Sequence, residues 1–349
     1  MTADAPAPAP ADETANPLLV EVTRGSLVES RHRAAYALVD LAGRVVARAG
    51  DIERPVYPRS AIKALQALAM VESGAAAAYG LSQAEIALAC ASHNGEAVHV
   101  AAVTAWLERL GLGLSDLACG PQLPSEEASL RALFAAGGPA TPAHNNCSGK
   151  HSGLLTLALR LGGPTAGYQR IHHPVQQRVL GVLEAMTGLD LSRAPRGTDG
   201  CSIPTVAVPL GNLALAMARL GNPDDQPDAR QAACRTVRQA AAEPYMLGGA
   251  GDFVTAVMRL AGARVLVKNG AEGVFCASFP ELGLGLALKV DDGAARAAQV
   301  LMGRLLLACE ILSEEEIRTL QPYLAPSLIN RAGLAVGEIR ATGPAAMLR

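Results

Sequence analysis

Ser60-Ala61-Ile62-Lys63 places a hydroxyl and an amine three residues apart at the start of a predicted helix. Residues i and i+3 share one face of a helix, so the Lys63 amine can reach the Ser60 hydroxyl. A serine attacks a carbonyl carbon only when a base takes its proton, and lysine is such a base when burial or a nearby cation lowers its pKa. An isolated match is more often a helix-start serine beside a solvated lysine, so other residues must decide.

Two further segments follow in the chain. Ser92-His93-Asn94 comes after the apolar run 86–91, and Lys268-Asn269-Gly270 ends the apolar strand 265–267. The order S-x-x-K, S-x-N, K-x-G resembles that of serine β-lactamases and penicillin-binding proteins, whose motifs are S-x-x-K, S-D-N and K-T-G. The joint occurrence predicts an acyl-transfer site in which Ser60, Lys63, Ser92 and Lys268 meet.

A third group of residues has the chemistry to hold a metal ion. Cys147 and Lys150 stand three residues apart at a predicted helix start, and Asp199 and Cys201 alternate along the chain. Alternate residues of an extended segment face the same way, so Asp199 and Cys201 would share a face. Two thiolates bind zinc well, whereas lysine is an unusual ligand that must be neutral. On spacing alone the alternative, two unrelated thiols, stays open.

Strands are expected at both chain ends and helices in the middle. Because sequential neighbours usually pair, the simplest fold is α+β: a mostly antiparallel sheet built from both chain ends, flanked by helices, with a mainly helical insertion at roughly 95–245. Residues 1–17 are Ala/Pro-rich, which predicts a disordered tail, and residues 18–349 are expected to form a single catalytic unit. The expected strands are 18–23, 34–40, 45–49, 263–268, 274–279, 284–290 and 336–339. The expected helices are 60–71, a helix opening at the capping box of Ser82 and Glu85, 97–110, 126–135, 151–161, 175–186, 212–220, 229–242, 253–260 and 294–312.

The composition narrows the class of protein. The formal net charge is −2 and aromatic residues make up 3% of the chain, so we expect no nucleic-acid partner. No run reaches the ~18 uninterrupted apolar residues of a membrane span, and the N-terminus lacks a secretory signal's basic and apolar regions. The seven cysteines are odd in number and widely spaced, which suits a reducing compartment. We therefore expect a cytoplasmic location.

Together these segments resemble the Rhizobium-etli-type L-asparaginases, also called class 3 or the thermolabile asparaginase II family. That family is similar in fold to serine β-lactamases and glutaminases. The resemblance implies two Ser–Lys tandems, Ser60 with Lys63 and Ser92 with Lys268. It also implies a zinc ion held by Cys147, Lys150 and Cys201, with Asp199 beside it. The resemblance covers nearly the whole chain from about residue 18 and rests on five stretches: 57–63, 90–96, 144–151, 198–202 and 268–273.

The function that the resemblance implies is hydrolysis of L-asparagine to L-aspartate and ammonia through an acyl-enzyme on Ser60. Zinc would not be needed to make the nucleophile. Two alternatives stay open: a glutaminase or another serine amidohydrolase on the same scaffold, and a non-catalytic protein that binds zinc or amino acids. A homodimer is expected because homodimers are the commonest oligomers. Substrate binding is assigned to Arg59, whose guanidinium suits a carboxylate, and to His93, Asn94 and Asp199.

Overall fold

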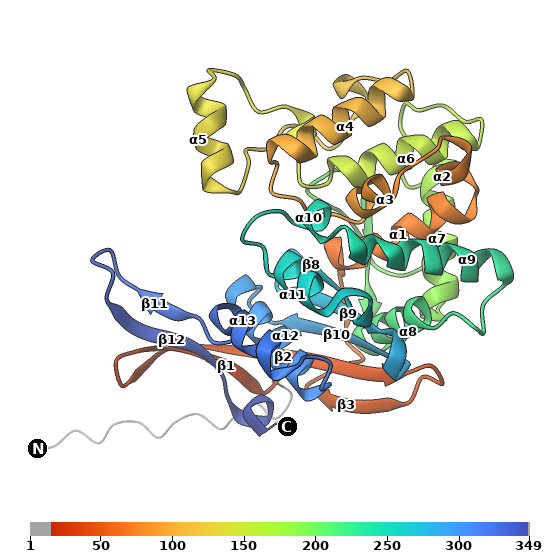
Figure 1. The fold of residues 1–349 in the computed structure, drawn as a ribbon. Helices are drawn as coiled ribbons and strands as arrows, with labels where there is room; N and C mark the ends of the chain where they lie inside the picture. Colours follow the sequence, from red (N-terminus) through yellow and green to blue (C-terminus); the bar gives the residue numbers. More distant parts are fainter. Residues whose placement is uncertain (1–14, 348–349) are drawn as a thin grey trace, which may run out of the picture.

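The computed structural model describes residues 15–347, and one antiparallel sheet runs through that part of the chain (Figure 1). Its eight strands have the order β11-β12-β1-β2-β10-β9-β8, and β3 pairs with the second half of β2. They are β1 (Leu18–Arg24), β2 (Leu27–Asp40), β3 (Val45–Ala49), β8 (Leu266–Gly270), β9 (Val274–Phe279), β10 (Leu284–Val290), β11 (Ser327–Ile329) and β12 (Ala335–Ala341).

The two chain ends meet at two places in this sheet. Val20 of β1 pairs with Ala341 of β12, and Tyr36 of β2 pairs with Leu288 of β10. Residues far apart in sequence therefore lie side by side, and all these pairings are antiparallel. The prediction of an α+β fold with a sheet built from both chain ends is confirmed.

Helices cover both faces of the central strands and form the upper part of the molecule in Figure 1. Strand β9 is buried at every position, as a strand is when both sheet faces are covered. Helices α8 and α12 both pack on β9 and β10. A Cβ at Gly285 of β10 would lie 2.0 Å from the Ala214 carbonyl oxygen, so glycine is what lets α8 approach the sheet so closely. The helices are α1 (Lys63–Glu72), α2 (Ala75–Ala78), α3 (Gln83–Ala89), α4 (Ala97–Arg109), α5 (Glu127–Ala135), α6 (Ser148–Arg160), α7 (Pro174–Thr187), α8 (Leu210–Gly221), α9 (Asp228–Arg238), α10 (Pro244–Leu247), α11 (Phe253–Ala261), α12 (Ala295–Ala308) and α13 (Glu314–Leu324).

Several expected elements differ in the structure. The helix expected at 60–71 starts as a 3₁₀ turn, η1 (Arg59–Ile62), before α1 begins at Lys63. The strand expected at 34–40 is longer and begins at Leu27. Helix α13 was not expected, although Ser313 and Glu316 form a capping box at its start.

The middle of the chain is mainly helical, and two short strand pairs lie in or beside it. They are β4 (Pro55–Val56) with β7 (Val208–Pro209), and β5 (Arg196–Thr198) with β6 (Pro204–Val206).

Most of the predicted tail, residues 1–14, lies outside the described residues. Asn16 and Pro17, which that prediction included, are instead packed. Asn16 donates to Asp291 Oδ1 at 2.8 Å and accepts from the Asp51 backbone at 2.7 Å, and the Pro17 carbonyl accepts from Ala34 N. The ordered unit therefore begins before residue 18.

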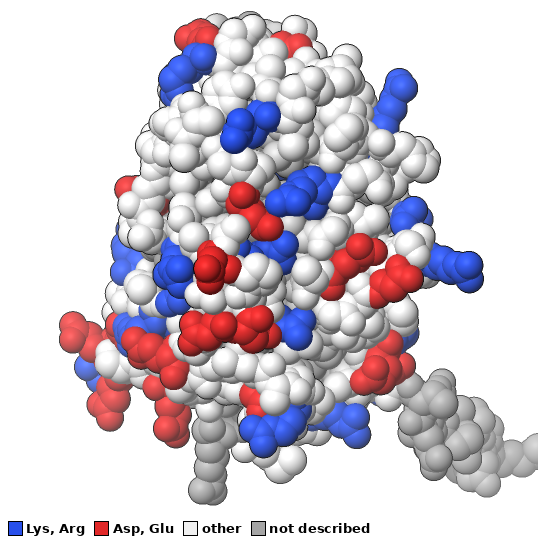
Figure 2. All heavy atoms as spheres, turned by 90° about the vertical axis from the view of Figure 1, so that its right-hand side faces the viewer, with Lys and Arg blue, Asp and Glu red and all other residues white. Residues whose placement is uncertain are grey.

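Charged residues are sparse and mixed in sign on the face drawn in Figure 2. Both signs of charge occur in the lower half, where several Asp and Glu side chains lie next to one another, and the upper part of this face is mostly uncharged. Among the described helices, none combines the length and the apolarity that crossing a bilayer requires.

Candidate active site

Ser60 sits on the η1 turn, close against the end of strand β8. Arg59, just before it, has a φ of 51°, a left-handed conformation that is strained for a non-glycine residue. Gly270 ends β8, and a Cβ there would lie 2.8 Å from the Pro58 carbonyl oxygen and 3.0 Å from Ala61 N. Glycine at this position therefore lets the strand carrying Lys268 abut the turn carrying Ser60.

Three of the four predicted catalytic side chains meet in a buried cluster. Ser92 Oγ lies 3.1 Å from Lys63 Nζ and 2.9 Å from Lys268 Nζ. Lys63 comes from the first turn of α1, Ser92 from the loop after α3, and Lys268 from β8. The hydroxyl oxygen of Ser92 is thus placed between two amines from distant parts of the chain.

Backbone and amide oxygens hold the two amines in place. Lys63 Nζ also donates to the carbonyls of Ala91 and, at 3.3 Å, Asn146. Lys268 Nζ donates to the carbonyl oxygen of Asn269 at 2.8 Å and to its Oδ1 at 2.5 Å. Each amine therefore has a fixed direction toward Ser92.

Burial lowers the pKa of both lysines, whose side chains are almost wholly inaccessible to solvent (0% for Lys63, 1% for Lys268). For Lys268, burial and then the neighbouring Lys63 lower the pKa to about 7. Asp252, Cys147 and Cys90 act on Lys268 in the opposite direction. A neutral amine, which is what a general base requires, is therefore accessible near neutral pH.

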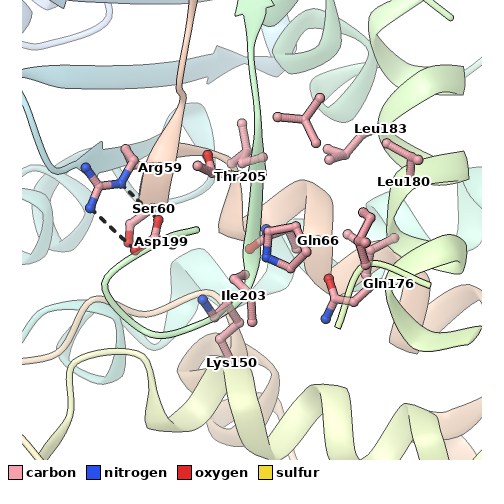
Figure 3. A pocket seen from close by; sticks show the side chains of 15 residues that line it. Arg59, Ser60, Gln66, Lys150, Gln176, Leu180, Leu183, Asp199, Ile203 and Thr205 are labelled. Atoms are coloured by element: carbon pink, nitrogen blue, oxygen red, sulfur yellow. Dashed lines mark hydrogen bonds and ion pairs between the residues drawn. The ribbon is translucent and has the colours of Figure 1, made fainter. Parts of the chain in front are cut away.

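Ser60 lies outside this cluster and faces a pocket. Its hydroxyl makes no hydrogen bond within residues 15–347, so the predicted contact between the Ser60 hydroxyl and the Lys63 amine is not formed in this arrangement. The Ser60 side chain lines a pocket of about 480 Å³ together with Arg59, Lys150 and Asp199 (Figure 3). The structure thus separates the Ser60 hydroxyl, which lines the pocket, from the Ser92 hydroxyl, which both amines hold.

Arg59 and Asp199 form a paired charge at the same end of the pocket. Arg59 Nε donates to Asp199 Oδ2 at 3.0 Å, and the second contact, Nη2 to Oδ1, is 3.5 Å (Figure 3). Burial opposes ionisation of Asp199, but the Arg59 hydrogen bond and the nearby Lys150 outweigh it and lower the pKa of the carboxyl. The pair offers a cation and an anion to the two ends of an amino-acid zwitterion.

Cys147, Lys150 and Cys201 also meet, beside the pocket. Lys150 Nζ donates to Cys201 Sγ at 2.8 Å. A hydrogen bond between the two thiol groups lowers the pKa of Cys147 and raises that of Cys201. Burial lowers the pKa of Lys150, but the two sulfurs outweigh it and the net shift is upward. Of the two sulfurs, Cys147 is therefore the one whose thiolate is favoured, whereas Lys150 donates to the other, Cys201.

A zinc ion at this place would have to be held by Cys147, Lys150 and Cys201 together. No cluster of three or more His, Cys, Asp or Glu among the described residues could hold a metal, so a metal here depends on Lys150 as the third ligand. Two sulfurs and an amine are suitable donors for zinc. Ligand atoms of a tetrahedral zinc lie about 3.6 Å apart, so Lys150 would have to lose its proton and move away from Cys201.

A comparison with protein families matches residues 20–341 to the family described as L-asparaginase II. The chain belongs to the L-asparaginase II family. Membership supports an amidohydrolase that acts on a small-molecule substrate, and it covers the pocket, the Ser92 cluster and the cysteine pair alike.

Solved structures give a more distant likeness. Crystal structures of a protein named Mglu, in its native form at 4.3 M NaCl and in its tris and glutamate form, are 16% and 17% identical over 81% and 87% of this chain, both with a TM-score of 0.43. A β-lactamase from Mycobacterium bovis is 12% identical over 75% of this chain and 88% of its own, with a TM-score of 0.37. At these values the likeness carries no argument about function. The chain spans 61% and 63% of the two Mglu chains, and no curated protein matches it.

Two residues assigned to substrate binding lie away from the pocket of this L-asparaginase II family member. His93 is buried; its Nδ1 accepts from Gly95 N at 3.1 Å and its Nε2 contacts Ser148 Oγ at 2.8 Å. Asn94 donates to the Ala250 carbonyl at 3.0 Å and accepts from Ser125 Oγ at 3.1 Å. Both side chains hold the loop that carries Ser92 to its neighbours. Their polar atoms are therefore already hydrogen-bonded within the protein.

The sequence interpretation overlooked two pocket residues. Gln66 of α1 and Gln176 of α7 line the same pocket as Ser60, and both are buried. A signal for Gln66 was present, since it is a polar residue inside the apolar helical run 61–71. Gln176 gave no such signal, because its neighbour in sequence is another glutamine, and only the packing of α7 against α1 directs it inward.

Proposed function

We propose that this protein hydrolyses the side-chain amide of L-asparagine to L-aspartate and ammonia, with Ser60 as the nucleophile. The observation that carries the proposal is the position of Ser92 Oγ between the buried amines of Lys63 and Lys268, behind a pocket that Ser60 lines. A protein that only binds a ligand needs no pair of buried bases, so this cluster favours catalysis over the non-catalytic alternative.

Substrate binding is assigned to the charged end of the pocket. The α-carboxylate of L-asparagine would face the Arg59 guanidinium and the α-ammonium would face Asp199, which already carry opposite charges 3.0 Å apart. This leaves the side-chain amide directed at Ser60. We no longer assign substrate binding to His93 and Asn94, because their polar atoms are engaged elsewhere.

The proton steps follow from the cluster. Neutral Lys63 takes the Ser60 proton as Oγ attacks the amide carbon, which requires the Lys63 amine to turn from Ser92 toward Ser60 when substrate is bound. Backbone N–H groups at the start of this segment would stabilise the oxyanion. Ser92 passes the proton between Lys63 and Lys268 and on to the leaving ammonia. A water molecule then hydrolyses the aspartyl ester and restores the Ser60 hydroxyl.

Zinc stays a proposal, with Cys147, Lys150 and Cys201 as its ligands. When bound, it would supply a positive charge beside the substrate site. No step above depends on it. The homodimer and the cytoplasmic location also remain predictions.

The test is replacement of Ser60 by alanine. Ser60→Ala should lower ammonia release from L-asparagine by at least ~10³-fold, because the residue forms the bond to substrate. Ser26→Ala, on an exposed turn, is the matched control and should leave the rate unchanged. Acid-quenched wild-type enzyme should carry an aspartyl mass on the peptide containing Ser60.

Three results would count against the proposal. Undiminished turnover in Ser60→Ala, or the aspartyl mass on the peptide containing Ser92, would rule out the assigned nucleophile. Faster turnover of L-glutamine than of L-asparagine would rule out the assigned substrate.

A further inference from the structure

The pocket at Ser60 has two chemically different ends. Arg59, Asp199 and Lys150 supply charge at one end. Leu180 and Leu183 of α7, with Val206 of β6, form apolar walls at the other. A zwitterion such as L-asparagine needs the charged end only, since its amide reaches Ser60 there.

The apolar end offers a substrate a further contact. Apolar walls gain free energy only when an apolar group displaces water from them. The amino-acid part of a substrate occupies the charged end, so an apolar group that contacts these walls must extend from the amide toward α7.

Gln66 lies between the two ends. In Figure 3 its side chain is drawn between Ser60 and Asp199 on one side and the α7 leucines on the other. Gln66 is only 8% exposed, and its side-chain amide forms no hydrogen bond within the described part of the chain. The amide lines the pocket, and a carboxamide can both donate and accept. It therefore suits the N–H and C=O of a substrate amide.

We infer that the enzyme also cleaves L-asparagine derivatives whose amide nitrogen carries an apolar substituent. This rests on the proposed function. The substituent would contact Leu180 and Leu183 while the amide faces Gln66. Ser60 Oγ forms an ester with the amide carbon as the C–N bond breaks, and the Ser60 proton leaves on the primary amine. Water then adds its hydroxyl to the acyl carbon and its hydrogen to Ser60 Oγ, which gives L-aspartate and no net redox change.

The experiment compares two substrates on the purified full-length protein. Wild-type enzyme is assayed for ammonia from L-asparagine and for benzylamine from N4-benzyl-L-asparagine. We expect kcat/KM for the benzyl compound to lie within about tenfold of that for L-asparagine, because the free energy gained where the benzyl group contacts the apolar walls offsets the cost of fitting a larger substrate. Cleavage of L-asparagine with no benzylamine release overturns the inference but leaves the proposed function standing. Release of neither amine overturns both.

Variants that fill the apolar end give a second readout. Leu183→Trp, or the milder Leu183→Phe, should lower kcat/KM for the benzyl compound by at least about tenfold and leave that for L-asparagine within about twofold. Retained L-asparagine turnover also reports that the variant folds. Leu161→Trp, an exposed position at the end of α6, is the control. Equal loss on both substrates in both Leu183 variants would contradict the placement of the substituent against α7.

Discussion

Among the single residues of this site, Ser92 is central because its hydroxyl connects the two lysines. It contacts the amines of both Lys63 and Lys268, so the two Ser–Lys tandems expected from sequence are not independent pairs. Two lysines that share one hydroxyl disfavour each other's charge, and burial adds to that effect. The two amines therefore titrate as one coupled group, and a proton is able to move between Lys63 and Lys268 through the Ser92 hydroxyl.

The pKa of Lys268 should set the acid side of the pH–rate profile. Below about pH 7 its amine is protonated in the folded protein, so kcat/KM should rise with pH through that value. Asn269→Asp would place a carboxylate where Oδ1 now accepts from Lys268 at 2.5 Å. The added anion favours the charged amine, so the acid limb should shift upward by about one pH unit or more.

Profiles of kcat/KM against pH for wild type and Asn269→Asp test this expectation. Asn222→Asp, after α8, makes the same chemical change away from the cluster and should not move the limb. A limb that stays in place in Asn269→Asp, or moves to lower pH, would mean that Lys268 is not the group that titrates.

At the scale of elements, close packing of helix α6 brings its first turn to the site. Gly149 stands between Cys147 and Lys150, and a Cβ there would lie 2.2 Å from the Leu88 carbonyl oxygen. Only glycine allows α6 to approach α3 so closely. The same approach brings Lys150 to Cys201, which lies between β5 and β6.

The close packing of α6 places the three proposed zinc ligands next to one another. If Cys147, Lys150 and Cys201 bind zinc, wild-type protein equilibrated with zinc and dialysed should keep about one ion per chain, and Cys201→Ser should keep at least tenfold less. Elemental analysis measures the content. Cys234→Ser, a buried cysteine on α9, is the matched control. Equal zinc content in wild type and Cys201→Ser would refute the assigned ligands.

Across the whole molecule, the two chain ends hold the sheet together, and Asn16 links three distant segments of it. Its side chain bonds to Asp291 and Asp51, and its carbonyl accepts from Arg33 Nη1 at 2.6 Å. Asn16→Ala removes the two side-chain bonds and leaves the Asp51 backbone N–H without this partner. The free energy of unfolding should fall by about 1–3 kcal/mol.

Urea unfolding followed by circular dichroism measures this change. The exposed Ser26→Ala serves again as the control and should shift the midpoint little. Unchanged stability in Asn16→Ala would show that the ordered unit does not depend on residues before the first strand.

Local pattern was enough to predict much of this protein. The short apolar runs 274–279 and 284–290 predicted β9 and β10 at their observed bounds, and Ser82 with Glu85 predicted the start of α3. These features depend on neighbours in sequence, which is why they can be read without a structure. The residue types of Ser60, Lys63, Ser92 and Lys268 likewise indicated acyl-transfer chemistry before any geometry was known.

Tertiary structure decided which of those side chains touch. Lys63 turns from Ser60, its neighbour along the helix, to Ser92, because the loop after α3 brings Ser92 and two backbone carbonyls to its amine. His93 stands beside Ser92 in sequence yet points into the core, and Gln66 and Gln176 meet in a pocket although 110 positions separate them. Contacts of this kind depend on how whole elements pack, and periodicity along the chain carries no information about the distance between elements.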